Sequence, residues 1–213
     1  MQLQNGSHGL RVAFFQLYSR VHASRGLAVV RLDVLSFDIA FVGGFEHTPN
    51  TDAVKYFVKE VWPLVRELKL DAKFIVVGSK VPEEIHALAE EDIIIKGWAP
   101  DLSEIFCKVR LSVAPLRFGA GVKGKILSSL SHGTPCVASS NAVEGTGMKH
   151  GVHILVCDDP LQVAHGIKRL YSDEVLWEKL SDEGYRFCRN RFSHQAVGLK
   201  LLGLLNDLGI QVR

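Results

Sequence analysis

The chain has 213 residues, of which 47% are hydrophobic and 23% charged, and its 25 Lys and Arg residues nearly balance its 23 Asp and Glu residues. This composition excludes an intrinsically disordered chain and a broad basic surface, so no nucleic-acid partner is expected. The length is enough for one large domain or two small ones, each with a core of its own.

Four cysteines lie far apart in the sequence and form no CxxC pair: Cys107, Cys136, Cys157 and Cys188. Their spacing indicates neither a zinc cluster nor a compact disulfide framework, and it suits a reducing compartment. Residues 1–9 are polar and lack the apolar segment of a signal peptide, and charges interrupt the most apolar stretch, residues 26–45. We therefore expect buried or incidental thiols in a cytoplasmic protein that meets a membrane only through a partner.

From residue 37 onward, short apolar runs alternate with helical patterns. The runs, each typical of a parallel strand covered on both faces, are 37–42, 73–78, 92–97, 111–116, 134–139 and 152–157. Apolar residues at helical spacing predict helices over 54–68, 83–90, 101–108, 122–132, 160–171, 174–191 and 193–207. This alternation predicts an α/β fold over residues 37–213: a Rossmann-like, doubly wound, six-stranded parallel sheet flanked by helices.

Residues 1–36 fit this scheme poorly. Two apolar stretches in this segment, 10–18 and 26–35, suit either a strand or a buried helix. We expect the segment to be an extra edge element or the remnant of a preceding domain.

The expected topology brings two unusual loops together. In an open parallel sheet, ligands bind beyond the carboxyl ends of the strands, where the strand order reverses. In the order 3-2-1-4-5-6, the first and fourth strands are neighbours at that point. The loops that leave these two strands, residues 43–50 and 117–125, are rich in glycine and are expected to meet at one crevice.

The first loop combines close backbone approach with a helix start. Gly43 and Gly44 have no Cβ to keep a ligand at a distance. Pro49 and Asn50 begin a helix whose free N–H groups favour an anion, and His47 is a candidate for a phosphate or sugar contact. A plain turn from strand to helix is the alternative interpretation.

The second loop points to phosphate more strongly. Gly119, Gly121 and Gly124 precede a helix and free several N–H groups to surround phosphate oxygens, and Lys123 and Lys125 add positive charge. A tight turn would need fewer glycines. The loop therefore predicts a phosphate-binding site.

Two further motifs match this loop only weakly. The spacing of Gly119, Gly121 and Gly124 satisfies the dinucleotide fingerprint, which would make the chain a nicotinamide-binding oxidoreductase. However, the loop follows the fourth strand, and the next strand ends on Ser-Ser-Asn instead of an acid. A P-loop would need a hydroxyl at the position of Ile126 to hold magnesium.

Two charged residues near the loops have open roles. Arg117 could hold a phosphate with two hydrogen bonds or form a surface salt bridge. Glu144 follows the fifth strand and could accept hydrogen bonds from sugar hydroxyls or be a solvated loop charge. Three tryptophans fall within or beside apolar segments, so we expect them to pack in the core: Trp62, Trp98 and Trp177.

The segments FVGGFEHTPNTDAVKYFVKEVWP (41–63) and VAPLRFGAGVKGKILSSLSHGTPCVASSNAVEG (113–145) together resemble the C-terminal half of retaining glycosyltransferases with the two-domain GT-B fold, family 4 (group 1). The similarity covers about residues 37–205. In that family this half binds a nucleotide-diphosphate sugar, the N-terminal half binds the acceptor, and the reaction takes place between them.

The resemblance assigns roles to the two loops. It implies that Gly43 and Gly44 face the donor diphosphate, that Lys123 or Lys125 neutralises it, and that residues 119–121 offer backbone amides. Such groups stabilise a departing nucleoside diphosphate more than the bound substrate. No cofactor and no metal are expected, since lysines and helix dipoles supply the positive charge.

Two departures from the family pattern matter. The family commonly carries two glutamates around this helix, but the second position is Ser128 here and the first, near Gly119 and Ala120, has no carboxylate. A serine bonds a ribose hydroxyl singly and without charge, which weakens donor affinity by about one to two decades. The segment before residue 37 is also too short for an acceptor domain.

The chain is thus expected to be an excised domain, a natural subunit or a remnant. An apolar stripe on the last helix could bind a separate acceptor-domain protein or a second copy, or it could cover residues 1–36: Val197, Leu201, Leu204, Leu205 and Leu208.

The sequence therefore predicts the donor-binding domain of a retaining glycosyltransferase of polysaccharide biosynthesis. It would transfer a hexosyl group from a UDP-, GDP- or ADP-sugar to a glycan or lipid-linked acceptor and be incomplete and inactive alone. The alternative is a non-catalytic nucleotide-sugar-binding module or subunit. Base selection is expected around residues 78–81 and 98–102.

Overall fold

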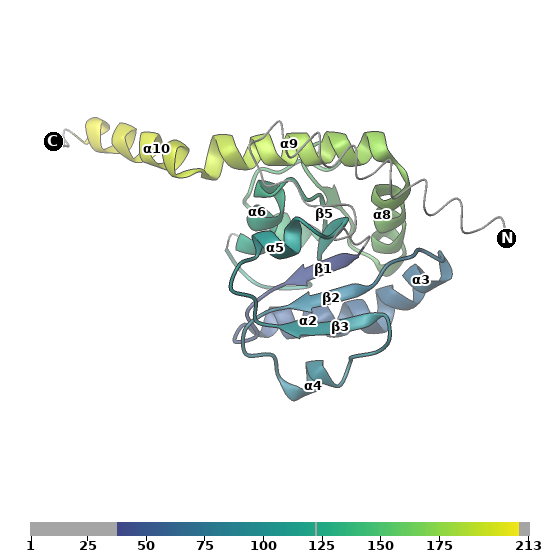
Figure 1. Ribbon diagram of the computed structural model, residues 1–213. Coiled ribbons are helices and arrows are strands. Elements are labelled where there is room, and N and C mark those ends of the chain that lie inside the picture. Colours follow the sequence, from purple (N-terminus) through teal and green to yellow (C-terminus); the bar gives the residue numbers. More distant parts are fainter. Residues whose placement is uncertain (1–37, 122, 209–213) are drawn as a thin grey trace.

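The computed structural model describes residues 38–121 and 123–208, so the expectations for residues 1–36 lie outside the described residues. The described part forms one six-stranded parallel sheet in the order β3-β2-β1-β4-β5-β6, with helices on both faces (Figure 1). This is the doubly wound architecture that the alternating pattern predicts. None of the described helices is long and apolar enough to cross a bilayer.

Strands and helices alternate along the chain as expected. The strands are β1 (Ile39–Val42), β2 (Phe74–Val77), β3 (Ile93–Gly97), β4 (Leu111–Ala114), β5 (Cys136–Ala138) and β6 (Leu155–Val156). The helices are α2 (Thr48–Tyr56), η2 (Phe57–Val61), α3 (Trp62–Glu67), α4 (Glu83–His86), α5 (Ser103–Phe106), α6 (Gly124–Ser131), α7 (Ser140–Val143), α8 (Pro160–Ser172), α9 (Glu174–Phe192) and α10 (His194–Asp207).

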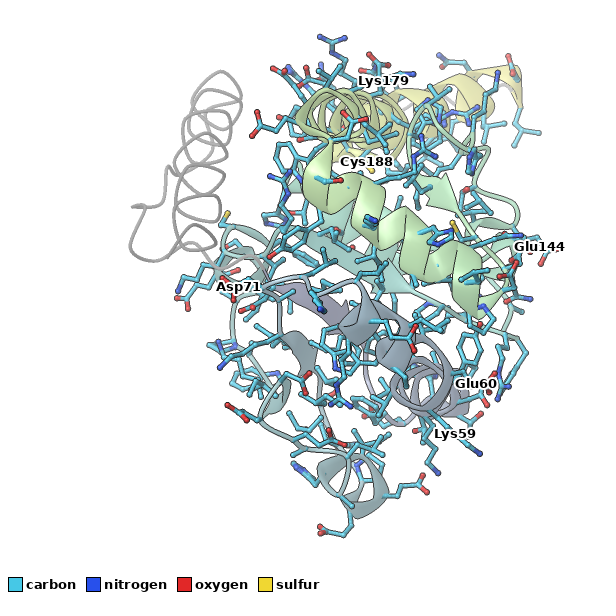
Figure 2. The ribbon with its side chains drawn as sticks, turned by 90° about the vertical axis from the view of Figure 1, so that its right-hand side faces the viewer. Lys59, Glu60, Asp71, Glu144, Lys179 and Cys188 are labelled. Carbon is cyan, nitrogen blue, oxygen red and sulfur yellow. The ribbon has the colours of Figure 1, made fainter. Side chains whose placement is uncertain are left out.

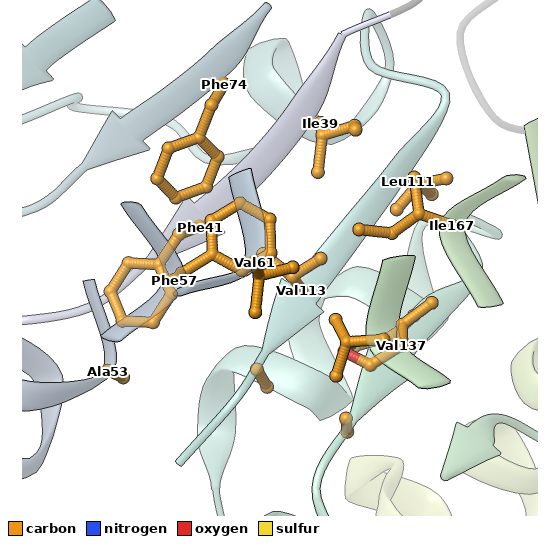
Figure 3. Close-up of a cluster of buried hydrophobic side chains, with 14 of the residues drawn as sticks. Ile39, Phe41, Ala53, Phe57, Val61, Phe74, Leu111, Val113, Val137 and Ile167 are labelled. Carbon is orange, nitrogen blue, oxygen red and sulfur yellow. Dashed lines mark hydrogen bonds between the residues drawn. The ribbon is translucent and has the colours of Figure 1, made fainter. Parts of the chain in front are cut away.

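The core lies on both faces of β1. Successive side chains of a strand point to opposite faces. Phe41 belongs to the larger cluster, which includes Phe57 and Phe74 (Figure 3), whereas Ala40 packs with Phe106 of α5 in a second cluster. Because both faces are covered, every residue of β1 is buried. This explains why its sequence is a continuous apolar run.

The first predicted helix is interrupted by a π-helical turn, η2. Pro63 has no amide hydrogen to donate to the carbonyl four residues before it, and the chain adapts just ahead of it. There the Trp62 amide donates to the Phe57 carbonyl, five residues earlier. The turn leaves the rings of Phe57 and Trp62 buried, while Lys59 and Glu60 project to solvent (Figure 2).

The last helix, α10, extends away from the body of the protein (Figure 1). None of its residues is buried: Leu199 and Leu204 are 64% and 61% exposed, and Leu208, just beyond its end, is 74% exposed. The predicted apolar stripe is therefore uncovered by the described residues.

The first glycine loop continues the pairing of β1 with β2. The Gly43 amide donates to the Val77 carbonyl at 3.0 Å, and the Phe45 amide donates to the Ser79 carbonyl at 3.0 Å. Gly78 lies between these two bonds, and a Cβ there would be 1.8 Å from the Gly43 carbonyl oxygen. Only glycine fits this crossing of the two backbones.

We expect Gly78→Ala to lower the free energy of unfolding by about 3 kcal/mol, because a backbone atom cannot move aside as a flexible side chain can. Chemical denaturation monitored by circular dichroism measures this loss. Gly198→Ala in α10, where an added Cβ meets nothing within 4 Å, is the matched control and should leave stability unchanged or slightly higher. Equal stability of the two variants would contradict the close approach.

Candidate functional site

A pocket of about 620 Å³ opens at the carboxyl edge of the sheet. Both glycine loops border it, together with the first turns of α2 and α6 and the start of α5. Its lining residues are Val42, Gly43, Gly44, His47, Pro49, Asn50, Leu102, Leu116, Gly119, Ala120, Lys123, Gly124, Lys125 and Ser128. Among these described residues the ionisable side chains are histidine and lysine, with no carboxylate. The pocket therefore favours an anion.

The two loops touch each other, as the predicted strand order requires. A Cβ on Gly119 would lie 3.2 Å from Cγ of Pro49, so the second loop runs directly over the start of α2. Gly119 has φ of +121° and Gly121 of +79°, a backbone region that side chains with a Cβ rarely adopt. Backbone conformation thus favours glycine at both positions, and space restricts Gly119 as well, whereas a Cβ on Gly121 would meet nothing within 4 Å.

Lys123 closes the second loop onto itself. Its ammonium donates to the carbonyls of Ala120, at 2.7 Å, and Gly121, at 2.9 Å. These bonds hold the loop over the pocket while the side chain remains at the pocket wall.

Lys125 is the most unusual charge in the site. Its Nζ lies 4.7 Å from the centre of the Phe41 ring and donates to Oδ1 of Asn50. Burial, with a smaller contribution from the neighbouring Lys123, lowers the pKa of this ammonium to about 8. A charge held in so apolar a setting gains more from an arriving anion than an exposed lysine would.

Most of the predicted site residues line this single pocket: Gly43, Gly44, His47, Asn50, Gly119, Lys123, Lys125 and Ser128. Gly121 belongs to the same loop but is not among the lining residues. Whether any of them binds a donor stays a prediction.

Arg117 and Glu144 are placed elsewhere. Arg117 forms a two-pronged ion pair with Asp52 and lies over the Tyr56 ring, beside a smaller pocket of about 270 Å³. Of its two expected roles, this geometry matches the salt bridge. Glu144 is exposed at the margin of the molecule and does not line the larger pocket (Figure 2).

The expectation for one of the three tryptophans is wrong. Trp62 and Trp177 are 1% and 0% exposed, but Trp98 is 68% exposed at the end of β3. The chain leaves β3 through Gly97, whose φ is +74°, and so carries the indole out of the core. Leu102, a little further on, lines the pocket, and neither feature can be recognised from apolar periodicity.

The four cysteines are buried and form no disulfide, as expected. Burial raises the pKa of Cys136 to about 12 and that of Cys157 to about 11, so these thiols are poor nucleophiles. In the part of the chain that the structure describes, no group of three His, Cys, Asp or Glu side chains could hold a metal ion.

We expect the stability of the wild type to rise by about 2 kcal/mol relative to Lys125→Met between pH 8 and pH 10. In this window the unfolded lysine is still protonated, whereas the folded one, with its pKa at about 8, loses its proton. The unfolded state thus binds more protons, and stability increases with pH. Denaturant titrations at several pH values measure the difference, and parallel curves for the two proteins would contradict the burial of this charge.

Comparisons with known proteins assign the family. The family model described as "Glycosyl transferases group 1" matches residues 36–173, more than half of the chain. A curated protein of Klebsiella pneumoniae, named "Uncharacterized 44.6 kDa protein in cps region", is 22% identical over 176 residues, which are 78% of this chain and 45% of that protein. The chain therefore spans less than half the length of this relative.

Solved structures share the fold at low identity. Anabaena Alr3699/HepE in complex with UDP has a TM-score of 0.70 and 14% identity, over 91% of this chain and 55% of that one. TarM of S. aureus has a TM-score of 0.67 and 16% identity, over 80% of this chain and 35% of that one. The C-terminal domain of the group 1 glycosyl transferase LpcC from Francisella tularensis has a TM-score of 0.62 and 14% identity, over 85% of this chain and 98% of that domain.

These likenesses confirm the predicted fold, the Rossmann-like C-terminal half of the GT-B architecture. Together with the family match over residues 36–173, they show that the chain is a member of the glycosyl transferases group 1 family.

Proposed function

We propose that the pocket binds the diphosphate of a nucleotide sugar and that the chain is the donor-binding part of a retaining glycosyltransferase of family 4. The observation that carries this proposal is the buried Lys125 ammonium beside two glycine loops in one pocket without a described carboxylate. Structures with the same fold are described in complex with UDP and with UDP-glucose, which supports this class of donor.

The proposed chemistry is electrostatic. When the bond between sugar and diphosphate breaks, negative charge grows on the leaving diphosphate, and Lys123 and Lys125 would stabilise it there. The dipoles at the starts of α2 and α6 would add to this stabilisation. Groups aimed at this developing charge lower the barrier more than they strengthen substrate binding. On this basis donor binding needs neither a metal ion nor a cofactor.

Ser128 would set a limit on donor affinity. It lines the pocket from the second turn of α6, where the resembling family commonly has a glutamate for the ribose. A neutral hydroxyl offers the ribose one weaker hydrogen bond in place of a charge-assisted one. The exposed indole of Trp98 and the neighbouring residues 99–102 are the expected surroundings of the base, for which UDP, GDP and ADP are the candidates.

The acceptor side would come from outside the described residues. We infer a hexosyl transfer to a glycan or a lipid-linked acceptor in polysaccharide biosynthesis, since the Klebsiella pneumoniae relative is named for a cps region. An isolated donor half would bind nucleotide without turnover. A non-catalytic nucleotide-sugar-binding subunit is the second candidate, and the Ser128 substitution favours it. The expected location for both is the cytoplasm.

Isothermal titration with UDP, GDP and ADP tests the proposed donor site. We expect at least one of them to bind, and we expect the Lys123→Ala, Lys125→Ala double variant to bind it about 100-fold more weakly, because two charge-assisted hydrogen bonds are lost. Lys55→Ala removes an exposed lysine of α2 that pairs with Glu84 and is the matched control. Absence of binding by all three nucleotides at millimolar concentration, or unchanged affinity of the double variant, would contradict the proposal.

We further propose that α10 is covered by another protein surface, either an acceptor-binding domain or a second copy. Its leucines are too exposed for a helix that functions alone in water. If a second copy covers it, sedimentation should detect a dimer at micromolar concentration that Leu201→Lys with Leu204→Lys abolishes. Leu161→Lys in α8 is the control, since Leu161 and Leu201 are 54% and 55% exposed. A monomeric wild type would contradict the proposal that a second copy covers α10, and an acceptor-binding domain would then be the proposed partner.

A further inference from the structure

One side chain joins the two loops of the pocket. Asn50 is 6% exposed, although it is polar and lies next to the opening of the pocket. Its Nδ2 donates to the Gly44 carbonyl at 2.6 Å, and its Oδ1 accepts from the Lys125 ammonium. The amide thus contacts the first loop with its donor and the second loop with its acceptor.

Packing holds this amide in a single place. A Cβ on Gly43 would lie 2.8 Å from Cγ and 2.9 Å from Nδ2 of Asn50, so the glycine makes the room that the amide occupies. The Asn50 backbone is fixed as well, because its amide donates to the His47 carbonyl at 2.9 Å. The side chain has little freedom to turn away from Lys125.

We propose that Asn50 is a positioning residue that ties the two glycine loops together and holds the Lys125 ammonium toward the anion in the pocket. This inference rests on the proposed function, and it gives Asn50 a role that acts through Lys125 instead of through contact with the donor. The structure supports it with two hydrogen bonds that meet at one buried side chain, which donates to Gly44 of the first loop and accepts from Lys125 of the second.

The chemistry of the site requires an amide here. The Gly44 carbonyl needs a donor and the ammonium needs an acceptor, and an asparagine side chain offers one of each. An aspartate has no donor for the carbonyl, and its charge would pair with Lys125 and cancel the attraction for a phosphate. A neutral acceptor orients the ammonium and leaves its charge available.

The surroundings of Lys125 determine how its proton responds to these contacts. Burial has the largest effect on the Lys125 pKa and favours the neutral amine, Cys136 of β5 acts in the opposite sense, and a smaller effect of Lys123 adds to that of burial. His47 is the remaining ionisable side chain among the described residues that line the pocket. No described carboxylate lies at the wall, and the Asn50 oxygen accepts a hydrogen bond from the ammonium, a contact that favours the charged form.

The test is the titration of the Lys125 ammonium, monitored by NMR of protein with lysine labelled with ¹³C at Cε. The Lys125 signal is assigned by comparison with Lys125→Arg. In the wild type we expect a midpoint at about 8. Asn50→Ala removes the acceptor and should lower the midpoint by about 1 pH unit, whereas Asn50→Asp adds a negative charge and should raise it by at least about 1 unit. An aspartate in the first turn of α2 is compatible with the helix.

A second readout is UDP affinity between pH 7 and pH 9.5. Wild-type affinity should fall as pH rises through the Lys125 midpoint, and Asn50→Asp should bind UDP about 10-fold more weakly at pH 7 because the ammonium is already paired. Asn190→Asp in the exposed part of α9 is the matched control and should change neither readout. Thermal unfolding of each variant confirms that it is folded.

The outcomes separate this inference from the proposed function. If Lys125 titrates at the same pH in all Asn50 variants, Asn50 does not position it, and the inference is wrong even when UDP binds. If the midpoint moves in the two opposite directions but UDP, GDP and ADP do not bind, the contact with Lys125 stands and the donor site is wrong. If Asn50 had only a structural role in α2, its substitution would change neither the Lys125 midpoint nor the pH dependence of UDP affinity.

Discussion

The pairing of β1 with β4 is the constraint on which the rest of the site depends. Ile39 lies opposite Leu111 and Ala40 opposite Ser112, so two segments about 70 residues apart leave the sheet side by side. Parallel strands send their connections out at the same edge. The glycine loop after β1 and the glycine and lysine loop after β4 therefore share a pocket, and their helices α2 and α6 start at its walls.

Within that pocket, the Lys125 ammonium is a positive charge in apolar surroundings. Burial destabilises the Lys125 ammonium, and the Phe41 ring and the Asn50 oxygen offset only part of this cost. A site without a described carboxylate would bind an anion without first having to break an ion pair. Arg117 illustrates the opposite case, because its pairing with Asp52 leaves its charge largely satisfied.

The chain matches one domain of longer proteins that share its fold. The chain covers 98% of an isolated C-terminal domain of a related enzyme but only 35% to 55% of longer proteins with the same fold. If the proposed donor site is correct, the groups that complete a transfer reaction would approach the pocket from the carboxyl edge of the sheet. The leucines of α10 are a second surface, which the described residues leave uncovered.

By itself, the sequence determined the layered architecture, the positions of the six strands and the identity of the two loops, because burial on both faces of a parallel sheet leaves a strong local pattern. It also identified Lys125 as a residue of the predicted pocket, although not its contact with Asn50. Only the tertiary structure decided the π-helical turn before Pro63, the exposure of Trp98 and the pairing of Arg117 with Asp52. These features depend on contacts between residues that are distant in the sequence. The burial and pairing of a side chain follow from its neighbours in space, which the local periodicity of apolar residues does not reveal.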